Sequence, residues 1–385
     1  IYKEPEIKPE MREYFRQVVF DTYGGAYTEN CRSIIKTEGG YMLVGDTVST
    51  GAGKTDMYLA KIEADGNLAF TRTYGGRADE SATAICRRRG GGYILAGGTD
   101  SFGYGEADAY IVAVDDRGDF MWERFYGGVN YDYLYSVSPV KEGGYIAAGY
   151  SSSFSGNNSD AYLLRIAENG DKLWEKVFGG DSWDTFYSVV EAAGGGFTAA
   201  GYTGNTVTRR SDMYVVHTDA KGNSVWSRTY GGGREDQATG IINTDGGYLI
   251  TAKSSSYIAG GFGWDIVAKK IDSKGNSLWT MVFPAAVTEP GSRALEADGG
   301  YVIAGTKTCY GICRTDALLI KVDAEGNTKW FKVYSERGNN SGAAVVKDGE
   351  GGYALAGTTS SRGRGDFFLL RVDGEGEERK LKTEN

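Results

Sequence analysis

Histidine, proline and cysteine are all scarce in this chain of 385 residues, and these scarcities exclude several classes of structure. A single histidine, His217, excludes a histidine-rich metal site. It also argues against a Ser-His-Asp triad, because other repeats hold Lys or Arg at its position, as at Lys61 and Arg165, which indicates an exposed polar residue. Five prolines beside 59 glycines favour many tight turns. Four cysteines are too few for a disulfide scaffold. Cys309 and Cys313 lie in one short stretch, where a local disulfide and two free thiols are both open.

The chain also lacks an excess of positive charge and long apolar runs. The net charge of −9 leaves no strongly basic face, so we expect no nucleic-acid partner. No apolar run approaches the roughly 20 residues that span a bilayer, so we expect no transmembrane segment. The chain opens on Ile1 rather than Met, which fits an exported protein whose signal peptide has been removed.

A Gly-Gly-aromatic motif is present in seven copies and organises the whole chain. The intervals between successive aromatic residues are 51 to 53 residues. The seven aromatic residues are Tyr41, Tyr93, Tyr145, Phe197, Tyr248, Tyr301 and Tyr353. A period this regular indicates one supersecondary unit that stacks on copies of itself.

The sequence of each unit predicts four short strands. In the third unit these are residues 132–141, 145–150, 160–166 and 173–178, separated by Gly-rich or Asn-Gly turns. The third strand of each unit is apolar on both faces, which requires a neighbouring sheet on either side. Seven such sheets in a ring satisfy this requirement and protect their edges. We therefore predict an all-β fold, a seven-bladed β-propeller of four-stranded antiparallel blades.

The last unit lacks an apolar fourth strand, and the N-terminal segment has the missing pattern. The Tyr23-Gly24-Gly25 sequence matches the end of the fourth strand in other units. We predict that residues 15–23 fill this position in the last blade and close the ring. The alternative is that residues 379–383 form this strand. Residues 1–13 read as a linker or tether, and residues 14–385 as a single propeller domain.

A tryptophan follows a Gly-Asn or Gly-Asp turn in five of the units: Trp122, Trp174, Trp226, Trp279 and Trp330. This pattern resembles the tryptophan-docking repeat of quinoprotein propellers and, less closely, the Asp-box turn of sialidase propellers. The whole unit resembles propeller repeats of secreted and surface-attached bacterial and archaeal proteins. The resemblance implies that the turn motif braces neighbouring blades, and that the protein is extracellular or on the cell surface.

Two series of acidic residues repeat with the units. The first begins each third strand with aspartate, and seven copies favour a structural role: Asp56, Asp108, Asp160, Asp212, Asp265, Asp316 and Asp366. The second lies at the start of the units and is replaced by Asn340 in the last: Glu29, Glu80, Asp132, Asp184, Asp236 and Glu289. A ring of these carboxylates would be hydrogen-bonded, or would bind a cation such as Ca²⁺.

The units also differ, and their differences point to a binding site. Units 3 and 4 place aromatic residues beside the second acidic series: Tyr131, Asp132 and Tyr133, then Trp183 and Asp184. Sugar rings stack on aromatic faces and donate hydrogen bonds to acids, whereas interblade packing is the structural alternative. Glu80, Asp236 and Trp264 belong to the same expected face.

We expect a non-enzymatic, extracellular or cell-surface module that contacts a glycan, a cation or a protein through the loops of one face. An alternative is a polysaccharide-acting enzyme, a glycosidase or lyase, that uses Glu80, Asp132 and Asp184. A further alternative, implied by the docking-like repeats, is a quinoprotein-like oxidoreductase. Copies of the chain could also assemble into a surface array.

Overall fold

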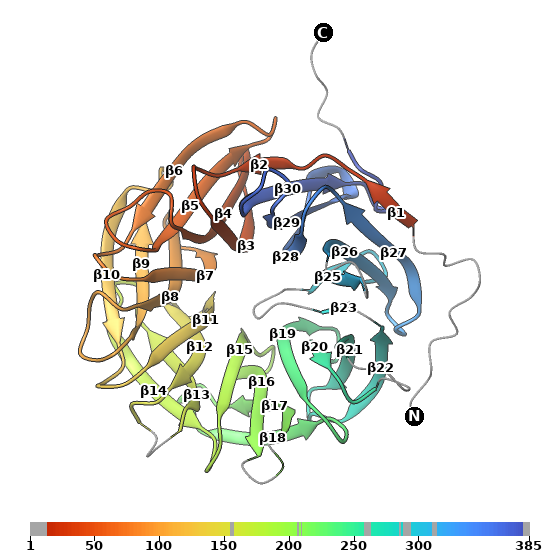
Figure 1. Cartoon of the computed structure of the whole chain (residues 1–385). Coiled ribbons are helices and arrows are strands. Elements are labelled where there is room, and N and C mark those ends of the chain that lie inside the picture. Colours follow the sequence, from red (N-terminus) through yellow and green to blue (C-terminus); the bar gives the residue numbers. More distant parts are fainter. Residues whose placement is uncertain are drawn as a thin grey trace.

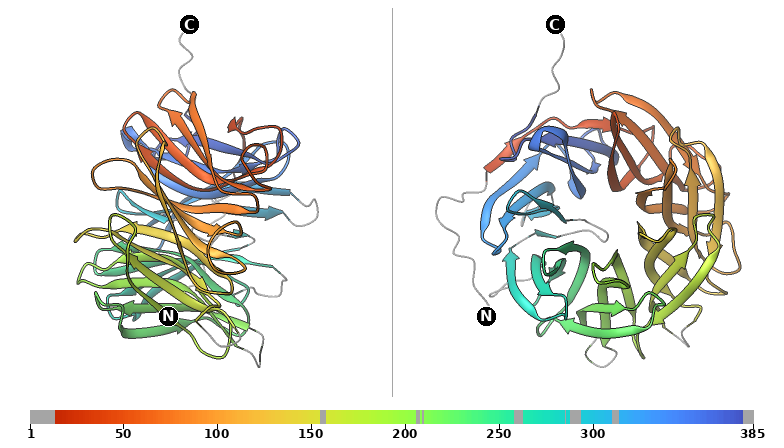
Figure 2. Two further views of the ribbon diagram at one scale, coloured as in Figure 1. Left: turned by 90° about the vertical axis from the view of Figure 1, so that its left-hand side faces the viewer. Right: turned by 180° about the vertical axis from the view of Figure 1, so that it is seen from behind.

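The computed structural model describes residues 14–154, 158–205, 208, 210–257, 263–284, 286–287, 294–309 and 314–379. Residues 14–16, 286–287, 308–309 and 350 are described by their backbone alone. Seven antiparallel sheets surround a central axis, as Figures 1 and 2 show. The predicted seven-bladed propeller is therefore confirmed. Within the described residues, no helix is long and apolar enough to cross a membrane.

In each blade the strands are named A to D, from the central axis outward (Figure 1). Blade 1 contains β3 (Glu29–Thr37), β4 (Gly40–Thr47), β5 (Asp56–Glu63) and β6 (Leu68–Tyr74). Blade 2 contains β7 (Glu80–Arg87), β8 (Tyr93–Thr99), β9 (Asp108–Val114) and β10 (Phe120–Tyr126). Blade 3 contains β11 (Asp132–Pro139), β12 (Tyr145–Ser151), β13 (Asp160–Ile166) and β14 (Lys172–Phe178). Blade 4 contains β15 (Asp184–Glu191), β16 (Phe197–Asn205), β17 (Arg210–Thr218) and β18 (Ser224–Tyr230).

The remaining blades follow the same plan. Blade 5 contains β19 (Asp236–Thr244), β20 (Gly247–Ser254), β21 (Asp265–Asp272) and β22 (Ser277–Phe283). Blade 6 contains β23 (Ala286–Val287), β24 (Ala294–Ala297), β25 (Gly300–Cys309), β26 (Arg314–Asp323) and β27 (Thr328–Ser335). Blade 7 contains β28 (Asn340–Lys347), the 3₁₀ turn η1 (Gly349–Gly351), β29 (Tyr353–Thr359) and β30 (Asp366–Val372).

The N-terminal segment closes the ring, as predicted, but as two strands rather than one. β2 (Asp21–Tyr23) is antiparallel to β30 and supplies strand D of blade 7. β1 (Tyr14–Gln17) lies parallel to β27 on the outside of blade 6. Between them, Val18 and Phe20 are buried while Val19 points to solvent. The segment therefore bridges blades 6 and 7, and Figure 1 shows it beside the last strands.

The C-terminal end takes a smaller part in the same edge. Glu378 forms a bridge with Val372, and the Arg379 N–H donates to the Arg371 carbonyl. This contact lies beyond the part of β30 that pairs with β2, so both ends of the chain complete strand D of blade 7. The alternative strand at residues 379–383 lies outside the described residues beyond Arg379, as does the expected tether at residues 1–13.

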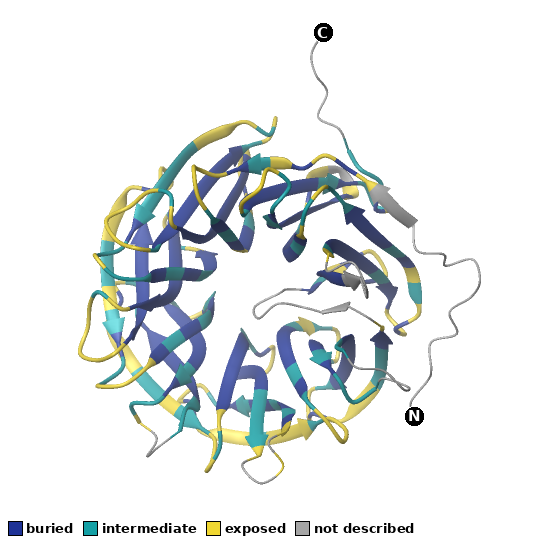
Figure 3. Ribbon diagram, viewed as in Figure 1, coloured by how far each residue is buried: buried dark blue, intermediate teal, exposed yellow. Residues whose placement is uncertain are grey.

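Burial explains why the third strands are apolar throughout. In β8 and β9 all residues are buried, whereas the outer β10 is mostly exposed or half-buried, and of its residues Tyr126 alone is buried. Figure 3 shows the same gradient around the ring. Strand A carries a β-bulge in several blades, and in blade 3 the bulge lies opposite Gly149. A Cβ at Gly149 would lie 1.7 Å from the Tyr133 carbonyl oxygen, so this position requires glycine.

Tryptophan and tyrosine side chains of strand D join neighbouring blades. The Trp122 ring lies against Gly170 in the C–D turn of the next blade, where a Cβ would come within 2.8 Å of the indole. The Tyr126 hydroxyl donates to the carbonyl of the same glycine at 2.6 Å. Tyr23, Tyr74, Tyr230 and Tyr334 donate in the same way to Gly66, Gly118, Gly275 and Gly376. These contacts are a brace between blades.

Candidate binding groove between blades 3 and 4

Two adjoining cavities form a groove on the face built by the D–A and B–C loops. One has a volume of about 390 Å³ and lies over blade 3 and the start of blade 4. The other, of about 510 Å³, continues toward blade 5. Asn158, Trp183 and Tyr202 line both cavities. Trp183 is 66% exposed, and Tyr131 at the edge of the first cavity is 50% exposed.

Tyrosine side chains from the inner strands form the floor of the first cavity. The ring centroids of Tyr135 and Tyr187 are 4.8 Å apart, and those of Tyr187 and Tyr202 are 5.8 Å apart. Tyr150 stacks on Tyr133 and contacts Tyr135. Burial raises the pKa of Tyr150 to about 12, and it also raises the pKa of Tyr135. These phenols therefore keep their protons at neutral pH and are hydrogen-bond donors.

Polar side chains surround the second cavity. The Asn158 side chain donates to the Asp181 carbonyl at 2.7 Å, which ties its loop to the loop that carries Trp183. Arg210 is exposed, and no described acidic residue forms an ion pair with it. Gln237 and Glu235 lie at the blade 5 end. The groove thus combines aromatic faces with amide, hydroxyl and charged groups, which is the usual composition of a small-molecule site.

The acids that the sequence placed beside these aromatics lie beneath the rim rather than on it. Asp132 is fully buried and accepts hydrogen bonds from the Gly128 N–H at 2.9 Å and the Ser153 hydroxyl at 2.5 Å. Asp184 is buried and accepts from the Gly180 N–H at 3.1 Å. Each carboxylate therefore caps the Gly-Gly turn before its own strand.

The other members of this acidic series are placed in the same way. Glu29, Glu80 and Asp236 are buried and accept from the N–H groups of Gly25, Gly76 and Gly232 at 2.9, 2.6 and 2.8 Å. Glu289 lies outside the described residues. Among the residues that the structure describes, no three His, Cys, Asp or Glu side chains are arranged so that they could hold a metal ion. A calcium site on this series stays a prediction.

Two further residues that the sequence analysis considered, Trp264 and His217, do not line the groove. Trp264 is half-buried, with the Lys253 ammonium 5.2 Å from its ring centroid. His217 is half-buried, forms a 2.9 Å hydrogen bond with Thr198 and stacks on Trp226. The expected pair Cys309 and Cys313 is not covered, because Cys313 and the Cys309 side chain lie outside the described residues.

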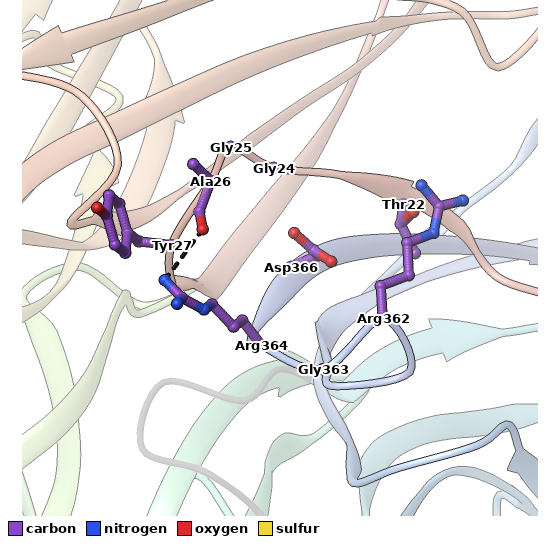
Figure 4. Close-up of a pocket in the computed structure, with 9 residues that line it drawn as sticks. All are labelled: Thr22, Gly24, Gly25, Ala26, Tyr27, Arg362, Gly363, Arg364 and Asp366. Atoms are coloured by element: carbon purple, nitrogen blue, oxygen red, sulfur yellow. Dashed lines mark hydrogen bonds between the residues drawn. The ribbon is translucent and has the colours of Figure 1, made fainter.

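A separate cavity of about 370 Å³ lies where blade 7 meets blade 1, and Figure 4 shows its lining. Arg364 turns toward Tyr27, 4.7 Å from the ring centroid, and donates to the Ala26 carbonyl at 3.1 Å. Asp366 lies between Arg362 and Arg364 in this view. Arg364 thus has its partners within the protein, a ring and a carbonyl, so this cavity is less suited to a ligand than the groove.

Tyr150 and Tyr202 were not among the residues that the sequence singled out. Both follow a strand B glycine, at the position that holds Asp46, Gly98 and Lys253 in other blades. An aromatic residue here in units 3 and 4 was the available signal. Their meeting with Trp183 depends on how blades 3 and 4 pack.

No family model matches this chain. The chain is 26% identical over 173 residues to the regulatory protein FlaEY of Caulobacter vibrioides, a match that covers 39% of this chain and 18% of that protein. Among solved structures, puromycin hydrolase superposes with a TM-score of 0.56 at 14% identity, covering 96% of this chain and 57% of that one.

Two other structures cover nearly the whole of both chains. YCF48 bound to D1 peptide gives a TM-score of 0.54 at 9% identity, over 95% of this chain and 99% of that one. Drosophila Plexin A in complex with Semaphorin 1b gives 0.52 at 9% identity, over 96% and 95%. At these identities the likeness shows the propeller fold alone.

Proposed function

We propose that this protein is a non-catalytic binding module, extracellular or on the cell surface, and that the groove between blades 3 and 4 binds a carbohydrate chain. The exposed ring of Trp183 between two adjoining cavities carries this proposal. A large aromatic side chain that stays exposed in a concave surface is a feature of binding sites. The location is supported by the resemblance of the repeats to those of secreted propellers.

The chemistry of the groove suits a sugar. An indole face offers an apolar surface to the C–H side of a pyranose ring, and neutral tyrosine hydroxyls and amides match its hydroxyl groups. The two cavities on either side of Trp183 have room for successive rings of one chain. Arg210 and Glu235, near the second cavity, add charged hydrogen-bonding groups.

The placement of acidic groups supports binding without turnover. Hydrolysis of a glycosidic bond normally needs two carboxyl groups that both reach the substrate. Among the described residues that line the two cavities, Glu235 is the one carboxylate. Asp132 and Asp184, the acids that an enzyme would need from this region, are buried beneath turns.

A glycan array tests this function with the wild-type protein, Trp183→Ala and Tyr104→Ala. Tyr104 is the matched control because it is an 85% exposed aromatic in a loop of the same face, outside the groove. We expect the wild type and Tyr104→Ala to bind the same glycans, and Trp183→Ala to lose at least tenfold in affinity. Absence of glycan binding, or equal binding by all three proteins, would contradict the proposal.

A further inference from the structure

At each of five described blade boundaries, a strand C aspartate of one blade faces the first acid of the next blade. The five pairs are Asp56–Glu80, Asp108–Asp132, Asp160–Asp184, Asp212–Asp236 and Asp366–Glu29. A glycine of the D–A turn leaves room for them. A Cβ at Gly179 would lie 2.4 Å from Asp184 Oδ2 and 2.6 Å from Asp160 Oδ1.

A glycine leaves room for the two acids at other boundaries as well. A Cβ at Gly75 would lie 2.3 Å from Glu80 Oε2 and 2.7 Å from Asp56 Oδ1. At the boundary of blades 7 and 1, Asp366 lies across from Gly24 in Figure 4, and a Cβ there would lie 2.2 Å from Asp366 Oδ1. The facing oxygen of the strand C aspartate is therefore Oδ1.

At two of these boundaries, hydrogen bonding leaves this oxygen unsatisfied. Asp108 is 0% exposed, and its Oδ2 accepts from the N–H groups of Tyr104 at 2.9 Å and Gly105 at 3.2 Å. No donor among the described residues reaches Asp108 Oδ1, and the same holds for Asp160 Oδ1. A buried carboxylate oxygen without a donor is costly, particularly when it faces another acid.

The boundary of blades 6 and 7 supplies an internal control. Here Asn340 replaces the acid of strand A, and Ser335 replaces the glycine of the turn. Asp316 Oδ1 accepts from the Asn340 side-chain amide at 3.3 Å and from the Ser335 hydroxyl at 2.8 Å. The one boundary with a single acid thus provides the donors that Asp108 and Asp160 lack.

We propose that the two boundaries where this oxygen lacks a donor, Asp108–Asp132 and Asp160–Asp184, each bind one small cation, a proton or a metal ion, between the facing carboxyl oxygens. The bound positive charge takes the place of the Asn340 amide and holds two blades together. A proton would make one member a carboxylic acid that donates to the other, and a metal ion would be shared by both carboxylates.

The surroundings of Asp108 fit this role. Burial raises the pKa of the Asp108 carboxyl, and the charge of Asp132 raises it further, against the lowering effect of the two N–H donors. Among the described residues, the other titratable groups that sense the charge of this pair are the phenols of Tyr150 and Tyr162, which carry no positive charge. Neither phenol supplies the missing charge.

Thermal unfolding of the wild type, Asp108→Asn and Asn340→Asp tests the proposal at pH 5 and pH 8, each with a chelator and with added calcium. With a bound proton, the wild type loses stability as pH rises, and Asp108→Asn raises Tm by a few degrees at pH 8 but not at pH 5. With a bound metal ion, calcium raises the wild-type Tm, the chelator lowers it, and Asp108→Asn reduces both shifts.

Asn340→Asp places a second acid opposite Asp316 and provides the reverse test. We expect this variant to lose Tm at pH 8 and to recover at pH 5 or with calcium, according to which cation binds. The proposal would be overturned if the Tm difference between each variant and the wild type were the same in all four conditions. A Tm loss on Asp108→Asn that no condition alters would also overturn it.

Discussion

The closing boundary, where blade 7 meets its neighbours blades 6 and 1, and the boundary between blades 3 and 4 use similar side chains for different purposes. At the closing boundary, Phe20 of the N-terminal segment stacks on Phe368 in the core between blades 6 and 7, with ring centroids 4.1 Å apart. On the other side of blade 7, the buried Asp348 accepts from Lys36 of blade 1 at 2.9 Å and from Arg371 at 2.8 Å. At the boundary between blades 3 and 4, Trp183 faces solvent. Aromatic surface and charge are satisfied internally where the ring closes.

This difference shows where a repeat protein keeps groups for a ligand. The closing boundary must join the two ends of the chain without a covalent link, so its apolar and ionic groups contribute to folding. The boundary of blades 3 and 4 is continuous in sequence and is already held by Trp174 against Gly222 of the next blade. Its extra aromatic residues can therefore remain exposed without loss of the fold.

The largest expected effect is at the closing boundary. Phe20→Ala removes a buried ring that stacks on Phe368, and we expect it to lower the free energy of unfolding by about 3–5 kcal/mol. Val19→Ala is the matched control, because Val19 is the neighbouring side chain and is 77% exposed. Urea denaturation of both variants measures the difference. Equal midpoints for the two would show that the N-terminal segment does not clasp the ring.

A second effect, of about 2–3 kcal/mol, is expected for Asp348→Asn, because Asp348 links blade 7 to Lys36 and Tyr41 of blade 1. Burial alone would raise the pKa of Asp348, but hydrogen bonds from Tyr41, Lys36 and Arg371 outweigh it and lower the pKa to about 2. The contribution is therefore present above the unfolded pKa of about 3.9 and is lost as pH falls toward 2.

Urea denaturation at several pH values checks this sign. The wild type and Asp348→Asn should differ most at neutral pH and converge in acid. A gap between the two proteins that persists unchanged down to the lowest pH at which they fold would argue against the ionic clamp.

A smaller effect concerns the interblade brace. Tyr126→Phe leaves the Gly170 carbonyl without its donor and should cost about 1–2 kcal/mol of unfolding free energy. Phe178 holds the equivalent position in blade 3, so Phe178→Tyr should instead add a donor to Gly222 and stabilise by up to about 1 kcal/mol. Denaturation midpoints that shift in the same direction for both changes would contradict this account of the brace.

Much of the propeller ring could be predicted from the sequence, because the period of about 52 residues and the Tyr-Gly-Gly strand endings repeat along the chain. The Tyr23-Gly24-Gly25 match identified strand D of blade 7. The parallel strand β1 could not be foreseen, since residues 14–17 have no counterpart in the other units. The pairing of β1 with β27 depends on where residues 14–17 lie once Val18 and Phe20 are buried, and the sequence does not give that position.

The groove was predictable only in part. Trp183 and Tyr131 were identified because they differ from the other units. The sequence around Asp132 and Asp184 does not distinguish a place on the rim from one beneath it. In the structure, N–H groups of the Gly-Gly turns donate hydrogen bonds to these carboxylates and hold them in buried positions. Tyr150 and Tyr202 reach the groove from separate blades, so their proximity follows from blade packing that a linear pattern does not describe.

The smallest expected change in stability is at the groove. Trp183→Ala removes a largely exposed ring, so the free energy of unfolding should stay within about 0.5 kcal/mol of the wild type. Phe20→Ala changes stability, whereas Trp183→Ala should change glycan affinity alone. Urea denaturation and calorimetric titration with an array-selected glycan measure both quantities for both variants. A large loss of stability in Trp183→Ala would mean that this ring braces the blades and is not held out for a ligand.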